Sequence, residues 1–112
     1  MITIDRQVER IKLRLQAVAM GQDLCVIITG GKEHIGSITF SYDKEAETIG
    51  FGTHKEKFVT EAVGEVLNKK YSGNFVICCG IHFDNITKEE IECVKDLALK
   101  ITEELCLKLK CS

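Results

Sequence analysis

The chain has 112 residues, with 15 Lys or Arg, 17 Asp or Glu and 45% apolar residues, a composition typical of one folded domain that spans residues 1–112. The formal net charge of −2 argues against nucleic acid or an anionic membrane as the main partner, because both require an excess of cations. No apolar run approaches the roughly 20 residues of a membrane helix, and no secretory leader is apparent, so we expect a cytoplasmic protein.

The first half of the chain predicts four strands. Residues 11–19 alternate apolar and polar side chains, the period-2 pattern of a half-buried strand, although they also fit a helical stripe. A strand is favoured because a glycine turn and the β-branched run 24–29 follow, which together predict a hairpin. Further strands are expected over 35–42 and 48–51, joined by a charged turn at 43–47. The first half is therefore predicted to form an antiparallel meander with residues 11–19 at an edge of the sheet.

The second half predicts two helices with one strand between them. Apolar residues recur at helical spacing over 55–71, and the continuous apolar run 74–79 predicts a central strand that is buried on both faces. Thr87 and Glu90 have the spacing of a capping box, so the last helix is expected to start at Thr87 and to continue to about residue 110. The predicted fold class is α+β, a mainly antiparallel sheet with helices packed on it, in the order ββββ-α-β-α.

The six cysteines lie mostly among apolar residues and show neither a C-x-x-C motif nor another zinc-type spacing. We expect them to be small, buried hydrophobic side chains in a reducing compartment.

Each of the three histidines has a glycine two residues away. Glycine allows a sharp turn or a close approach, and histidine can donate, accept or coordinate near neutral pH. Two of the three loops lie between a predicted strand and a predicted helix. If their strands run the same way, the loops meet at one sheet edge, where ligands of α/β proteins collect. The predicted binding residues are Gly30, Gly31, Lys32, His34, Gly36, His54, Lys55, Gly80, His82, Asp84 and Asn85.

Three interpretations of these loops stay open. Amide groups at two helix starts, with Lys32 and Lys55, would suit a phosphate. The imidazoles of His34, His54 and His82, with or without Asp84 or Glu33, would instead suit zinc or another divalent ion, although their spacing matches no zinc signature. In the third interpretation each histidine only bonds to its own loop, and Asp84 or Asn85 caps the following helix.

The order and spacing of these motifs resemble those of a known family. The motifs are Thr29-Gly30-Gly31, His34-Ile35-Gly36, Gly52-Thr53-His54-Lys55-Glu56, Gly80-Ile81-His82-Phe83-Asp84-Asn85-Ile86-Thr87 and Glu89-Glu90-Ile91. Over residues 11–105 the chain is similar to the prenylated-flavin chaperone-like family, typified by the small D subunit of gallate decarboxylase. This family is in turn similar in fold to the small proteasome-assembly chaperones, which are dimeric α+β proteins.

The resemblance implies an accessory protein for aromatic-acid decarboxylases that use prenylated flavin mononucleotide (FMN), with the decarboxylase large subunit as partner. The resemblance also implies that the site residues of the family correspond to His34, His54, Lys55, His82, Asp84 and Asn85 in this chain. The FMN phosphate would lie against the Gly80 or Gly52 loop, with Phe51 or Phe83 against the ring.

The leading hypothesis is therefore a non-catalytic module that binds a phosphorylated cofactor or a partner subunit. One alternative is a small zinc-type enzyme with three histidine ligands and Asp84 or Glu56 as general base. Another is an oligomeric assembly module without a ligand. A homodimer or a higher homo-oligomer is expected because the long predicted edge strand 11–19 is readily covered by a symmetric partner.

Overall fold

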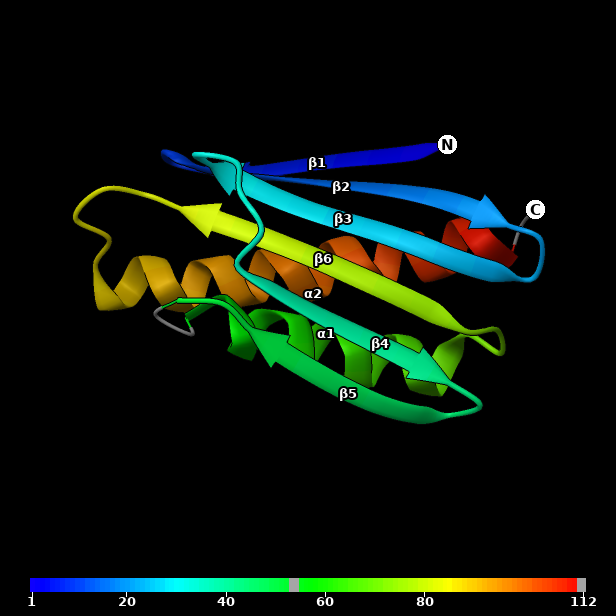
Figure 1. Cartoon of the computed structure of the whole chain (residues 1–112). Helices are drawn as coiled ribbons and strands as arrows, with labels where there is room; N and C mark the ends of the chain where they lie inside the picture. Colours follow the sequence, from blue (N-terminus) through cyan, green and yellow to red (C-terminus); the bar gives the residue numbers. More distant parts are fainter. Residues whose placement is uncertain (53–54, 111–112) are drawn as a thin grey trace.

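The computed structural model describes residues 1–52 and 55–110, without the side chains of Lys55 and Lys110. In this part of the chain six strands form one sheet in the order β1-β2-β3-β6-β4-β5, and two helices lie side by side on one face of it (Figure 1). The α+β class is confirmed. The elements are β1 (Ile2–Val8), β2 (Ile11–Met20), β3 (Asp23–Gly31), β4 (Ser37–Tyr42), β5 (Glu45–Gly50), α1 (Lys55–Lys70), β6 (Phe75–His82) and α2 (Lys88–Lys110).

The N-terminal segment forms a strand that the sequence analysis did not predict, so five strands rather than four precede the first helix. β1 pairs antiparallel with β2 along its whole length. Its signal in the sequence is weak because Ile4 is its one buried side chain. β2 is a strand, as expected, but it lies between β1 and β3, so the prediction that residues 11–19 form a sheet edge is wrong.

The predicted meander is also wrong, because β6 inserts between β3 and β4. β6 pairs parallel with β3 and antiparallel with β4. The physical reason is the apolar character of β6, which is best buried between two neighbours in the middle of a sheet. β6 runs to His82, beyond the predicted end at residue 79.

The turn between β4 and β5 is tighter than predicted. Only Asp43 and Lys44 form it, both with positive φ (53° and 71°), which is the conformation of a two-residue hairpin turn. Residues 45–47, expected in the turn, instead pair with β4. β4 itself begins at Ser37 rather than 35, since residues 32–36 cross from β3 over the end of β6.

The core lies between the sheet and the two helices. Within α1 the buried stripe is Val59, Val63 and Leu67, whereas Phe58, which also fits the helical stripe, is 75% exposed. The predicted capping box of α2 is confirmed: the Glu90 amide donates to Thr87 Oγ1 and the Thr87 amide donates to Glu90 Oε1, both at 3.1 Å. The fully buried large side chains include Leu13, Leu15, Val26, Ile28, Ile77, Ile101 and Leu105.

The cysteine prediction holds in part. Cys79 and Cys106 are buried, whereas Cys25, Cys78 and Cys93 are partly exposed; Cys111 lies outside the described residues. Burial raises the pKa of the Cys79 thiol to about 12, which keeps it protonated and unreactive. No helix in the described ranges has the length and apolar character that spanning a bilayer requires.

Candidate functional site

Three loops meet at one end of the sheet. β3 is parallel to β6, and β5 has the same direction because each is antiparallel to β4. The ends of these three strands therefore lie at one sheet edge, together with the starts of α1 and α2 (Figure 1). The predicted convergence of the loops after β3, β5 and β6 is confirmed in their described parts. His54 lies outside the described residues.

His34 links two of the converging segments. Its Nε2 lies 2.9 Å from Glu56 Oε1 in the first turn of α1, and its Nδ1 lies 3.0 Å from the carbonyl oxygen of Lys32. Glu56 is only 8% exposed, so its carboxylate depends on this contact for part of its solvation. The interpretation in which His34 bonds only to its own loop is therefore wrong.

His82 behaves differently from His34. Its Nε2 lies 3.1 Å from Asp84 Oδ1 within the same loop, and both side chains are exposed. No group of three His, Cys, Asp or Glu side chains is arranged to hold a metal among residues 1–52 and 56–109. The predicted ligand set of the zinc alternative includes His54, so the described residues do not test that set.

Several of the predicted glycines approach the protein's own chain. A Cβ at Gly80 would overlap the carbonyl group of His34, and one at Gly31, where φ is +66°, would overlap the carbonyl of His82. Two backbone hydrogen bonds fix this crossing: Lys32 N to His82 O at 3.0 Å and Gly36 N to Cys79 O at 2.8 Å. Glycine at these positions therefore allows the 32–36 loop to pack directly against the backbone of β6.

Neither Asp84 nor Asn85 caps α2, because Thr87 does so. Asn85 instead has a positive φ of 54°, a conformation that asparagine tolerates better than most residues. The Asp84 carbonyl accepts a 2.7 Å hydrogen bond from Arg10 Nη2. The roles of these residues in the loop are conformational, and a role in binding stays a prediction.

Arg10, which the sequence analysis missed, binds the loop that precedes α2 and the first turn of that helix. Its guanidinium binds both carboxylate oxygens of Glu90 (2.8 and 3.0 Å) and lies 5.9 Å from the centre of the Phe83 ring. The hydrogen bond from Arg10, followed by that from the Thr87 amide, lowers the pKa of Glu90 to about 2. Arg10 sits in the tight turn between β1 and β2, where no local motif indicates a distant partner.

We expect Glu90→Gln to flatten the acid dependence of stability. The Glu90 pKa falls from an ordinary value of 4.5 to about 2 in the folded chain, so its contribution is complete above about pH 4.5 and is lost as the pH falls toward 2. Urea midpoints measured between pH 6 and pH 2 should therefore fall less steeply in the variant than in the wild type. Glu89→Gln, one residue away, serves as the control, and equal slopes for Glu90→Gln and wild type would contradict the assignment.

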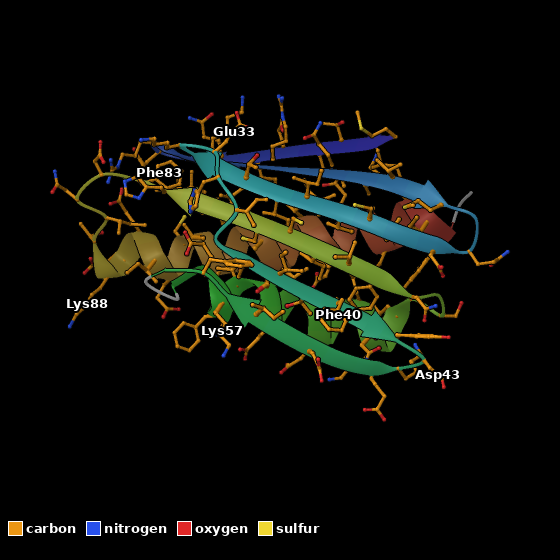
Figure 2. All side chains as sticks on the ribbon, viewed as in Figure 1. Glu33, Phe40, Asp43, Lys57, Phe83 and Lys88 are labelled. Carbon is orange, nitrogen blue, oxygen red and sulfur yellow. The ribbon has the colours of Figure 1, made fainter. Side chains whose placement is uncertain are left out.

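A cavity of about 730 Å³ opens beside these loops, between the first turns of the two helices and the end of β6. Its size falls within the range of small-molecule sites. Figure 2 shows Phe83, one of its lining residues, at this end of the molecule, whereas Asp43 lies at the opposite end. The lining residues are Glu56, Phe58, Val59, Ile81, His82, Phe83, Asn85, Ile86, Ile91, Glu92, Val94 and Lys95.

The walls of the cavity are mainly apolar, with polar groups at a few positions. Among its described side chains, Glu56 and Glu92 are acidic and Lys95 is basic, so the cavity is not cationic. His82 and Asn85 were predicted for the site and do line it; His34 reaches it only through Glu56. Phe58 and Ile91 could have been recognised as wall residues only from their exposure (75% and 41%), because their helical spacing is that of core residues.

The chain matches the family model described as "Prenylated flavin chaperone LpdD-like domain" over residues 7–110. The chain belongs to this family. A curated member, Protein LpdD of Lactiplantibacillus plantarum, is 32% identical, and the match covers 74% of this chain and 68% of the relative. The predicted resemblance is thereby confirmed, and membership of this LpdD-like family agrees with the predicted role as an accessory protein.

A solved structure shares the fold of this LpdD-like chain. The crystal structure of a chaperone complex for yeast 20S proteasome assembly contains a chain that matches with a TM-score of 0.65. The match covers 99% of this chain and 98% of that chain, at 10% sequence identity. The expected similarity in fold to proteasome-assembly chaperones is confirmed, and at this identity the match concerns the fold alone.

Proposed function

We propose that this chain is a non-catalytic accessory protein of a decarboxylase that uses prenylated FMN, acting in the cytoplasm as a homodimer or higher homo-oligomer. In this role it binds the flavin, or the decarboxylase subunit that receives it, at the end of the molecule where the three loops converge. The observation that carries the proposal is the mainly apolar cavity at that end in a member of the prenylated flavin chaperone family.

The chemistry of the cavity suits the ring end of a flavin better than its phosphate end. Aromatic and aliphatic walls such as Phe83 and Ile81 favour a flat, apolar ring system and its prenyl-derived part. Glu56 and Glu92 outnumber Lys95 in the walls and oppose a phosphate dianion. In the proposed orientation the phosphate stays outside the cavity, near the helix starts, where amide groups and Lys32 favour an anion.

Calorimetric titration with prenylated FMN, FMN and riboflavin tests the proposal. We expect all three to bind, with riboflavin within about tenfold of FMN because the phosphate lies outside the apolar walls. Ile86→Trp, which fills the cavity, should weaken binding at least tenfold, whereas Leu107→Trp, on an exposed position of α2 away from the cavity, should not.

A second measurement tests the accessory role itself. Co-expression of the wild-type chain with a prenylated-FMN decarboxylase should raise the cofactor content of the purified enzyme, and co-expression of Ile86→Trp should not. If none of the three flavins binds and the cofactor content does not change, the proposal fails. If FMN binds but riboflavin does not, the orientation fails and the function stands.

A further inference from the structure

A nearly buried carboxyl group lies in the wall of the mainly apolar cavity. Glu56, in the first turn of α1, is only 8% exposed. Glu92 and Lys95, the other Asp, Glu, Lys or Arg side chains among the described lining residues, are both exposed. A long charged side chain at the surface can turn its end toward water when a ligand enters, but a buried one cannot. Any ligand that fills the cavity therefore meets the carboxyl group of Glu56.

The carboxyl group of Glu56 is held on two sides before any ligand binds. His34 Nε2 lies 2.9 Å from its Oε1, and His34 Nδ1 lies 3.0 Å from the carbonyl oxygen of Lys32. Gly36 leaves the room that the carboxyl group occupies, because a Cβ at that position would lie 2.6 Å from Glu56 Cδ. A group whose position is fixed in advance loses less entropy when it binds a ligand.

The contacts of His34 determine what the remaining oxygen of Glu56 can do. Nδ1 of His34 carries a hydrogen atom, because its partner is a carbonyl oxygen, which can only accept. The contact between Nε2 and Oε1 then requires one further proton, either on the ring or on the carboxyl group. In both arrangements the second oxygen of Glu56, Oε2, carries no hydrogen atom and is an acceptor only.

Oε2 is the atom of Glu56 that a ligand can reach. It has no hydrogen-bond partner among the residues that the structure describes, and no side-chain oxygen of those residues is both sealed from solvent and unpartnered. Oε2 therefore contacts the open space of the cavity that Glu56 lines. A ligand that displaces water from this oxygen without offering a donor leaves a buried acceptor unpaired, which costs binding free energy. The cavity thus favours ligands that place a donor at this position.

We propose that Glu56 Oε2 accepts a hydrogen bond from an N–H group at the edge of the ring system that fills the cavity. This assignment rests on the proposed function and names the contact that selects the ligand. The ring system of an oxidised flavin carries one N–H group, at N3 on its pyrimidine edge. The ribityl chain, which carries the phosphate, leaves from the middle ring, so a pyrimidine edge turned toward Glu56 is compatible with a phosphate outside the cavity.

Calorimetric titration with riboflavin and 3-methylriboflavin, in which a methyl group replaces the N3 hydrogen, tests the proposal. We expect the wild-type chain to bind riboflavin at least about tenfold more tightly than 3-methylriboflavin. Glu56→Met keeps a long side chain but removes the acceptor, so the two affinities should then differ by less than about threefold. Glu61→Met removes a carboxylate from an exposed position of the same helix, away from the cavity, and should keep the wild-type ratio.

The variants separate the hydrogen bond from the size of the methyl group. The methyl group is equally large for every variant, so a folded Glu56→Met that keeps the wild-type ratio would show that shape alone excludes it and would overturn the proposal.

Nuclear magnetic resonance of riboflavin labelled with ¹⁵N in its ring gives a readout that needs no variant. The N3 hydrogen of riboflavin bound to the wild-type chain should exchange with water at least about tenfold more slowly than in free riboflavin, because it is hydrogen-bonded inside the cavity. Unchanged exchange, or a wild-type ratio below about tenfold, overturns the assignment of Glu56 and leaves the proposed function standing. If riboflavin does not bind at all, the assignment fails, and the cofactor content of the co-expressed decarboxylase decides the proposed function.

Discussion

Replacing Gly80 by alanine is expected to lower the free energy of unfolding by about 3 kcal/mol or more. Gly80 lies in β6 beneath the loop that carries His34, and a Cβ there would overlap the His34 carbonyl. The loop cannot move away freely, because backbone hydrogen bonds from Lys32 and Gly36 hold it on β6. Urea denaturation followed by circular dichroism measures the effect.

Gly21→Asn is the control for the Gly80 prediction. Gly21 has a φ of +64°, but no atom lies within 4 Å of the position of its Cβ. Asparagine tolerates this backbone conformation, so the expected loss is below about 1 kcal/mol. A loss for Gly80→Ala as small as the one expected for Gly21→Asn would show that the 32–36 loop can shift at little cost, and that the crossing over β6 does not restrict position 80.

Truncating Ile101 to alanine is expected to cost about 3–4 kcal/mol, whereas the same change at Ile91 should cost less than about 1 kcal/mol. Both residues belong to the predicted core stripe of α2, but Ile101 is fully buried and Ile91 is 41% exposed at the edge of the cavity. Removing atoms from a packed site loses apolar burial and leaves a void, and neither penalty applies in full at an exposed site.

The two isoleucine variants should also differ in the opposite sense in ligand binding. Ile91 lines the cavity and Ile101 does not, so Ile91→Ala should weaken riboflavin binding while Ile101→Ala should leave it unchanged at temperatures where the chain is folded. Urea midpoints and calorimetric titrations of both variants provide the comparison. A stability loss at Ile91 as large as that at Ile101 would contradict the assignment of Ile91 to the cavity wall.

Much of the local structure could be predicted because its causes are local. The β2 alternation, the apolar run of β6 and the Thr87–Glu90 capping box each depend on residues a few positions apart. The Glu45–Glu47 segment could not be recognised as a strand, because its polar side chains resemble a turn and its pairing with β4 depends on the tight turn at Asp43 and Lys44.

Only part of the candidate site could be predicted from the sequence. The sequence pointed to the loops after β3, β5 and β6 and to His82 and Asn85, because glycine and histidine mark such loops. It did not show that His34 would bind Glu56, that Arg10 would bind Glu90, or that Phe58 and Ile91 would line a cavity. The two hydrogen-bonded pairs join residues 22 and 80 positions apart. Phe58 and Ile91 line the cavity because the neighbouring elements do not cover their side of each helix.

The sequence by itself determined the α+β class, the position of most strands and both helices, and the family, because these depend on periodicity, capping and motif order along the chain. Only the tertiary structure decided that β6 separates β3 from β4, that β1 pairs with β2 as the edge strand, and that one face of the sheet has no helix. The physical reason is that strand order is set by which apolar surfaces bury one another, and that competition takes place between segments far apart in the chain.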